Sequence, residues 1–248
     1  MRRLVLAVST ALLMMMAAAP AWAHHDDDPK FVIHLKTPAS KPALICTGES
    51  PNDTTGGAAI PCSQYVTAWP VCLDADLYIV IAQVRPDTFD TEPANIAGAA
   101  FGITYDDVLN SGMDIVGLPT YCADGLIVPS GTSVFPEESG SSVRITWLTC
   151  QTQVIGNDGI HAIAMVFSVF AHGLDTFSII PNRNLTSGDE LNVANCSSQE
   201  FKLDTVDYGR IAATADFGVG VGCNPCVVGC IVPVAPATWG KIKNMYDR

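Results

Sequence analysis

Short runs of apolar and β-branched residues, separated by turn-forming residues, recur along the chain from residue 31 onward. The longest run, 160–171, is almost continuously apolar and follows Asn157, Asp158 and Gly159, which favour a tight turn. Runs of this kind predict buried β-strands. The strands that we expect are 31–36, 77–85, 96–105, 113–118, 142–147, 160–171, 176–180 and 191–194.

The spacing of these runs predicts the fold class. No stretch of the chain after residue 23 keeps a sustained helical period until the last residues, and Gly, Pro, Asn or Asp bounds most strands. Many short strands with such punctuation predict an all-β, antiparallel two-sheet β-sandwich. We expect residues 24–230 to form one domain, in which 37–70 and 125–141 are long loops.

The first 23 residues have a different pattern. Arg2 and Arg3 precede the apolar run 4–19, which Pro20 ends before the small residues of 21–23. This order is typical of a secretory signal peptide and is too short for a membrane span. We therefore expect cleavage after Ala23 and a mature protein that is secreted or held at the cell surface, with the periplasm as an alternative.

Export changes the interpretation of the cysteines, because thiols are oxidised outside the cytoplasm. Spacing makes the pairs Cys46–Cys62 and Cys122–Cys150 plausible but leaves the connectivity open. An odd cysteine must remain free, pair between chains or be lost with a processed tail. The candidates for disulfides are Cys46, Cys62, Cys72, Cys122, Cys150, Cys196, Cys223, Cys226 and Cys230. The last three also fit a redox or zinc cluster, but structural disulfides are the favoured interpretation.

Charge and missing motifs exclude several classes of function. Without the two arginines of the signal, the chain carries about 11 basic and 25 acidic residues, a net charge near −14. Such a charge disfavours binding to nucleic acid or to anionic membranes. The sequence contains no Gly-x-Ser-x-Gly, His-Glu-x-x-His, P-loop or dinucleotide-binding motif. We therefore expect a protein that is not an enzyme.

Several segments resemble a cohesin domain. Residues 96–106, ending in Tyr105-Asp106, and the short strand 113–116 resemble the middle of that family, and 158–169 with 176–180 resembles its later strands. The resemblance covers roughly 75–181 and implies a cohesin-like jelly-roll sandwich; cohesins bind dockerin domains in extracellular assemblies. Cohesins are poor in cysteine, unlike this chain, so no partner-contacting residue is carried over. The whole chain also resembles secreted bacterial proteins of uncharacterised function that end in Trp-Gly-x-Ile-Lys.

Two metal sites deserve testing, although we expect no cofactor. A mature amino-terminal His24, joined by one more histidine, fits a copper brace like that of secreted polysaccharide monooxygenases. The possible partners are His34, His161 and His172; an odd separation places the last two on opposite faces of a strand. Acidic pairs fit Ca²⁺ without an EF-hand spacing; they are Asp26/Asp28, Asp74/Asp76, Asp87/Asp90 and Asp106/Asp107. The alternative for both is a solvated surface.

Aromatic residues suggest two further contacts. Trp69, Tyr121 and Trp147 fit a sugar-stacking platform if they are exposed, although Trp147 also fits the core. After a Pro-rich linker, residues 231–248 end in a segment predicted to form a short helix with Trp239, Ile242 and Tyr246 on one side. This tail is either docked on its own domain or recognised by sorting machinery.

The sequence therefore favours a non-catalytic extracellular binding or structural protein for surface adhesion or assembly. Its expected partner is an extracellular protein or a polysaccharide. The alternatives are a carbohydrate-binding module and, more distantly, a copper oxidoreductase that uses His24.

Overall fold

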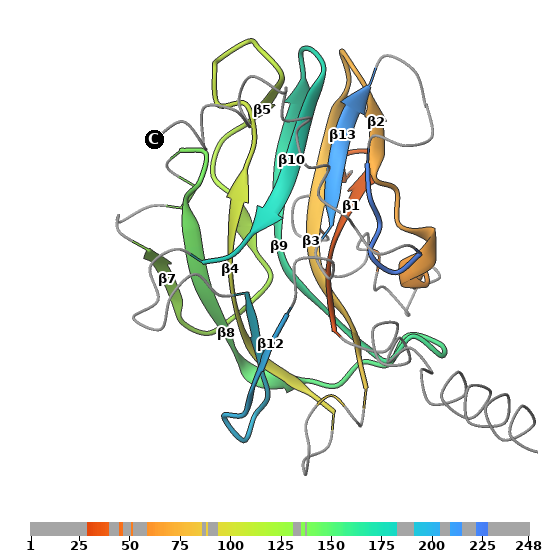
Figure 1. The fold of residues 1–248 in the computed structure, drawn as a ribbon, viewed down its shortest axis with the longest axis vertical. Coiled ribbons are helices and arrows are strands. Elements are labelled where there is room, and N and C mark those ends of the chain that lie inside the picture. The colour runs from red at the N-terminus through yellow and green to blue at the C-terminus, as the bar shows by residue number, and fades with distance from the viewer. Residues whose placement is uncertain are drawn as a thin grey trace, which may run out of the picture.

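The structure is a computed structural model that describes residues 29–39, 45–46, 51, 59–85, 88, 94–130, 135–136, 138–182, 191–203, 209–214 and 222–227. Within these ranges the chain forms two β-sheets, and the strands run close to the long axis of the molecule (Figure 1). The signal peptide, His24, Asp26/Asp28, Asp87/Asp90, Cys230 and the tail with Trp239, Ile242 and Tyr246 lie outside the described residues.

The first sheet has the order β1-β3-β9-β5, and β6 also pairs with β9. All its pairs are antiparallel. Its strands are β1 (Lys30–Lys36), β3 (Asp74–Val84), β5 (Met113–Ile115), β6 (Thr120–Tyr121) and β9 (Ile160–Ala171).

The second sheet has the order β12-β11-β4-β10-β13-β2, with β8 beside β4 and β7 beside β8. Its pairs are antiparallel except for β13 with β2, which is parallel. Its strands are β2 (Ala68–Pro70), β4 (Ile96–Thr104), β7 (Ile127–Ser130), β8 (Ser142–Gln151), β10 (Asp175–Ile180), β11 (Asn192–Ala194), β12 (Glu200–Lys202) and β13 (Arg210–Thr214). The all-β, two-sheet prediction is confirmed.

The predicted strands are present, with shifted ends. The strand expected at 113–118 stops at Ile115, and the one expected at 142–147 continues to Gln151. The two expected loops are partly regular: 37–70 contains a 3₁₀ turn (Cys62–Gln64) and β2, and 125–141 contains β7. These elements are three or four residues long, too short for a periodic pattern to reveal them. Within the described residues, no helix is long and apolar enough to cross a membrane.

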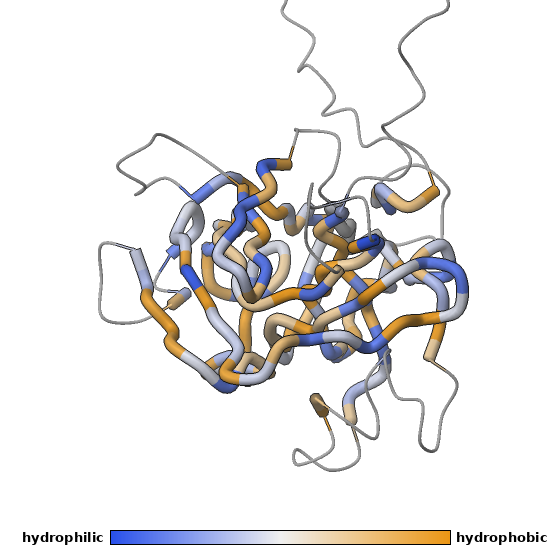
Figure 2. Tube along the Cα trace, turned by 90° about the horizontal axis from the view of Figure 1, so that it is seen from below, coloured by the Kyte–Doolittle hydropathy of each residue, from blue (hydrophilic) through white to orange (hydrophobic). Residues whose placement is uncertain are grey.

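The main core lies between the sheets. Phe31, Ile79 and Phe167 enter it from the first sheet, and Phe101 and Phe177 from the second. Seen from below, hydrophobic and hydrophilic positions alternate along several strands (Figure 2). That alternation is what burial of one face of each sheet requires. The prediction that Phe167 is buried between the sheets is confirmed.

A bulge in β9 changes which side chains share a face. Ile79 pairs with Met165 but Val80 pairs with Ile163, so Ala164 is an extra residue in β9. Its carbonyl accepts the amides of Cys122 and Ala123, at 3.1 and 3.3 Å. Because one extra residue reverses the alternation, His161 lies on the outer face together with Phe170, and the ring of His172 packs on Phe170. The prediction that His161 and His172 face opposite sides is therefore wrong.

A second, smaller core covers the outer face of the first sheet. Val32, Tyr78, Val80 and Val166 contribute its sheet side. Its cover includes the segment 59–67, which we call the strap, and the strap places Cys62 and Tyr65 in this core. The Val66 carbonyl accepts the Leu35 amide at 2.9 Å, so the strap also protects the free edge of β1.

Candidate functional site

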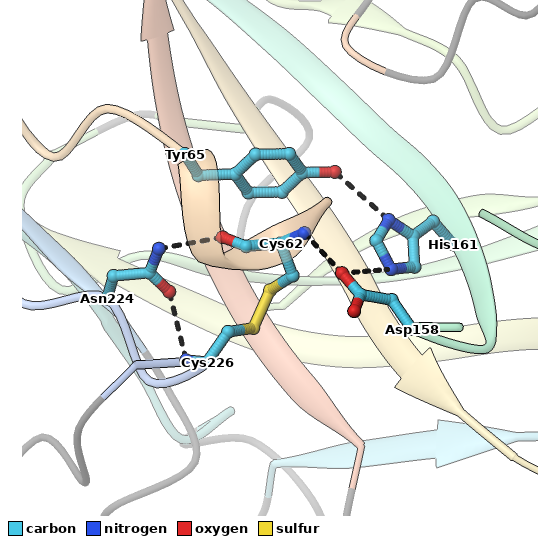
Figure 3. Close-up of polar contacts among 6 residues, drawn as sticks. All are labelled: Cys62, Tyr65, Asp158, His161, Asn224 and Cys226. Atoms are coloured by element: carbon cyan, nitrogen blue, oxygen red, sulfur yellow. Dashed lines mark hydrogen bonds and ion pairs between the residues drawn. A yellow bond between two sulfur atoms is a disulfide. The ribbon is translucent and has the colours of Figure 1, made fainter. Parts of the chain in front are cut away.

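The densest group of polar side chains lies where the strap meets β9 (Figure 3). The Tyr65 hydroxyl is 3.1 Å from Nδ1 of His161, and Nε2 of His161 is 3.9 Å from Oδ2 of Asp158. The same Asp158 oxygen accepts the Cys62 amide at 2.5 Å. His161 and Asp158 thus join the strap to β9 and to the turn that precedes it.

The surroundings of His161 determine which of its two ring nitrogens carries the proton. Its Nε2 is buried without a hydrogen-bond partner and points toward the Asp158 carboxylate, which favours the proton on Nε2. Nδ1 then accepts the hydrogen bond that the Tyr65 hydroxyl donates. Burial lowers the pKa of His161 to about 4, although the negative charge of Asp158 acts in the opposite direction. Burial, and then the charge of Asp158, raises the pKa of the Tyr65 hydroxyl.

A second buried histidine meets the strap one residue further on. Nδ1 of His34, on β1, accepts the Val66 amide at 2.9 Å, so this nitrogen carries no proton. The ring centroids of His34 and Tyr65 are 5.0 Å apart, and Tyr78 lies 6.2 Å away on β3. Burial, and then the charge of Lys36, lowers the pKa of His34 to about 4.

A disulfide holds the beginning of the strap. Cys62 is bonded to Cys226, and Asn224 bridges the same two residues by donating Nδ2–H to the Cys62 carbonyl at 2.7 Å and accepting the Cys226 amide at 2.9 Å (Figure 3). A carboxyl-terminal segment thereby fastens the strap to the outer face of the first sheet.

This polar cluster is suited to holding a structure together. Tyr65, His34 and His161 are 5, 5 and 1% exposed, so a substrate has no access to them. A tyrosine with a raised pKa is a poor base or nucleophile at neutral pH, and a histidine with a pKa near 4 is a weak general base. The cluster therefore lacks the access and the pKa values of an active site.

The opposite end of the sandwich carries Asp106 and Asp107, one of the pairs that we considered for calcium. Oxygens of Asp175 accept the amides of Asp106, Met113 and Thr176, and Asp106 accepts the Ser111 hydroxyl at 2.9 Å. Asp107 accepts the Ser139 amide. These carboxylates close the loops of this end. In the part of the chain that the structure describes, no three His, Cys, Asp or Glu side chains gather as a metal-binding group.

The copper brace stays a prediction, because His24 lies outside the described residues. His34 and His161 are buried, and each has Nδ1 engaged. His172 is partly exposed, but its Nε2 lies 3.1 Å from the Asp114 carboxylate.

The predicted sugar platform does not form. Trp147 is buried in the main core, while Trp69 and Tyr121 are half-buried and pack against it. The Trp69 indole donates to the Asp74 carbonyl, and the Tyr121 hydroxyl donates to the Phe135 carbonyl. Within the described ranges, every Phe, Tyr and Trp side chain is buried or half-buried.

The structure decides the pairing of most cysteines. Cys46 bonds to Cys122, Cys62 to Cys226 and Cys150 to Cys196, and Cys223 is disulfide-bonded as well. The suggested pairs Cys46–Cys62 and Cys122–Cys150 are wrong, because the folded sheets bring distant segments closer than neighbouring ones. Cys226 is bonded to Cys62 and not to Cys223 of the same Cys-x-x-Cys motif, which agrees with structural disulfides rather than a redox or zinc cluster. The odd cysteine is Cys72, which is free and exposed.

The contacts described so far do not explain a group of exposed aliphatic side chains on β8, on β7 and just before β7. Leu126, Val128 and Leu148 are 66, 41 and 80% exposed. Val128 pairs with Arg144, and Leu126 exchanges hydrogen bonds with Thr146, so the three lie on the outer face of neighbouring strands. Asp124, which accepts the Leu148 amide, lies on the same side. We call these three residues the edge patch.

Sequence reasoning missed both the edge patch and the strap contacts. The edge patch lies partly in the segment that we expected to be a loop, and the aliphatic run of Leu126, Ile127 and Val128 was its available signal. Tyr65 and Asn224 lie in turn-rich segments where no local pattern marks a buried polar residue. Their partners are 96 and 162 residues away in sequence.

Comparison with known proteins finds solved structures of low similarity to this chain. No family model and no curated sequence matches the chain. A type II cohesin domain from the cellulosome of Acetivibrio cellulolyticus is similar with a TM-score of 0.42 and 9% identity, covering 75% of this chain and 95% of that chain. The type II cohesin dyad from the adaptor ScaA scaffoldin of the same organism gives 0.37 and 12%, covering 61% of this chain and 47% of that chain. Both are cohesins, the family that the sequence resembles, and neither likeness carries a function over to this chain.

Proposed function

We propose that this protein is a non-catalytic extracellular binding module that docks a protein partner through the edge patch, in surface adhesion or assembly. The observation that carries the proposal is the edge patch itself. Three neighbouring aliphatic side chains are exposed on the outer face of the second sheet, which is typical of an interaction surface.

The chemistry of the patch favours a protein over a sugar. Sugar rings stack on flat aromatic faces, whereas Leu126, Val128 and Leu148 offer branched aliphatic groups. Arg144 and Asp124 supply charges of both signs beside them, as in the polar rim of a protein interface. Pro129 in β7 withholds an amide from any added strand, so we expect docking through side chains.

The test is a double variant, Leu126→Asp with Leu148→Asp, matched by Leu118→Asp. Leu118 is equally exposed but lies between β5 and β6, outside the patch. We expect the double variant to lose most of its retention on the surface of the native host, with a melting temperature within about 2 °C of wild type, while Leu118→Asp is retained.

Two results would argue against the proposal. Equal retention of all three proteins would remove the edge patch as the docking surface. If soluble polysaccharide released the wild-type protein from the surface, and the Leu126→Asp/Leu148→Asp variant were retained normally, the carbohydrate-binding alternative would be favoured.

A further inference from the structure

Two consecutive residues of the strap are held by two histidines from different strands. The Tyr65 hydroxyl binds Nδ1 of His161 on β9, and the Val66 amide binds Nδ1 of His34 on β1. Both histidines are almost completely buried and both act as acceptors. A charged imidazole carries a proton on each nitrogen and accepts nothing. Charging His34 therefore abolishes its hydrogen bond with the Val66 amide, whereas charging His161 reverses its hydrogen bond with the Tyr65 hydroxyl and places a charge in a buried site.

We propose that the strap is an acid-sensitive latch, which stays closed over the outer face of the first sheet only while His34 and His161 are both uncharged. This device lies on a different face from the edge patch and does not depend on the proposed docking function.

Burial has a larger effect on the pKa values of His34 and His161 than the charged groups around them. His161 faces Tyr65 of the strap and Asp158 of the preceding turn, and the carboxylate favours protonation without overcoming burial. His34 faces Tyr65 and Tyr78, and Lys36 on its own strand opposes protonation. Asp76 pairs across the sheet with Lys36 and accepts the Ala39 amide, so it holds a neighbouring part of the cover.

The sign of the pH dependence follows from these pKa values. In the closed strap both are about 4, against an ordinary value of 6.5, so the open state binds more protons as pH falls from about 6.5 toward 4. Between pH 7.5 and pH 5, the opening equilibrium should rise about 30-fold for each histidine, and several hundred-fold for the two together.

Opening would be local. The Cys62–Cys226 disulfide tethers the beginning of the strap, and β2 holds the chain just beyond its end by pairing with β13. Opening of the strap therefore exposes Val32, Val80 and Val166 beneath a tethered segment and leaves the main core between the sheets intact.

Amide hydrogen exchange tests the latch in the intact oxidised protein. The amide of Val66 binds His34, and the amide of Leu35 binds the Val66 carbonyl. After correction for the intrinsic rate at each pH, we expect protection of both to fall several hundred-fold from pH 7.5 to pH 5. The amide of Ile103, bonded to the Ser141 carbonyl in the second sheet, should keep its protection.

Substitutions show whether the pH dependence of amide protection comes from His34 and His161 or from a general sensitivity of the protein to acid. Asparagine offers an oxygen near the position of Nδ1 that does not titrate, so His34→Asn and His161→Asn should each remove about 30-fold of the pH dependence. His172→Asn, at the far end of β9, is the matched control and should remove none. Constant protection of Val66 and Leu35 in the wild-type protein would overturn the proposal without any variant. An unchanged pH dependence in the His34→Asn/His161→Asn protein would overturn it too.

Discussion

At the scale of single residues, a row of phenylalanine rings joins the two sheets. Phe31 lies 5.3 Å from Phe101, Phe101 is 6.3 Å from Phe135, Phe135 is 6.3 Å from Phe167, and Phe167 is 5.8 Å from Phe177, measured between ring centroids. Tilted and edge-to-face pairs at such distances add to the stability that burial provides. The row crosses between the sheets repeatedly, so loss of one ring weakens contacts on both sides.

Phe167 is the ring whose removal tests this packing. Phe167→Ala leaves a cavity between Phe135 and Phe177, and we expect the free energy of unfolding to fall by about 3–5 kcal/mol. Denaturant unfolding measures it, with Val108→Ala, at a side chain that is 62% exposed, as the control. An unchanged midpoint for Phe167→Ala would mean that the core lies elsewhere.

Tyr65 tests the polar cluster at the same scale. Tyr65→Phe removes the hydroxyl that binds Nδ1 of His161, and leaves both ring nitrogens of that buried histidine without a hydrogen-bond partner. We expect a loss of about 1–3 kcal/mol in the free energy of unfolding. Tyr121→Phe is the matched control: its hydroxyl also makes a hydrogen bond, to the Phe135 carbonyl, but the residue is only half-buried, so water replaces the bond at a smaller cost. Equal losses would show that burial of the Tyr65 contact has no special weight.

At the scale of elements, β9 shows where sequence reasoning succeeds and where it stops. Its bounds, 160–171, follow from an almost continuous apolar run. The bulge at Ala164 leaves no mark on that run, because the residues on both sides of the bulge are apolar and both faces of β9 are buried. It decides, however, that His161 lies on the strap side of the sheet.

The disulfides are a prediction at this scale, because they join elements that are far apart in sequence. Peptide mapping of unreduced protein, after alkylation of free thiols, should recover the pairs Cys46–Cys122, Cys62–Cys226 and Cys150–Cys196, with label on Cys72. The same protein, reduced before alkylation, is the control. A peptide that joins Cys46 to Cys62 would contradict the placement of the strap.

At the scale of the whole molecule, the two sheets differ in what covers them. The strap and its disulfide cover the outer face of the first sheet, whereas the edge patch on the second sheet keeps Leu126 and Leu148 exposed. In our proposals, the outer face of the first sheet carries the acid-sensitive strap, and the outer face of the second sheet binds a partner. This division makes the acid-sensitive latch and the docking surface separable by experiment.

The carboxyl-terminal tail is tested at this scale as well. Trp239, Ile242 and Tyr246 stand among Lys241, Lys243 and Arg248 in an acidic protein, which we interpret as an address for sorting or attachment. Deletion of 233–248 should leave the melting temperature within about 2 °C and reduce surface retention in the native host. Normal display of the truncated protein would rule out the address. A large loss of stability would instead mean that the tail docks on its own domain.

The sequence by itself determined the class of fold and most strands, because burial of a sheet face imposes a local apolar pattern that survives in runs such as 77–85 and 160–171. It also indicated that Phe167 is core and that cysteines form disulfides. Tertiary structure alone decided which residues are partners: Cys46 with Cys122, Tyr65 with His161, and Leu126 with Thr146. Those contacts depend on the register and bulges of paired strands and on how loops return across a sheet. Each joins residues whose separation along the chain carries no local signal.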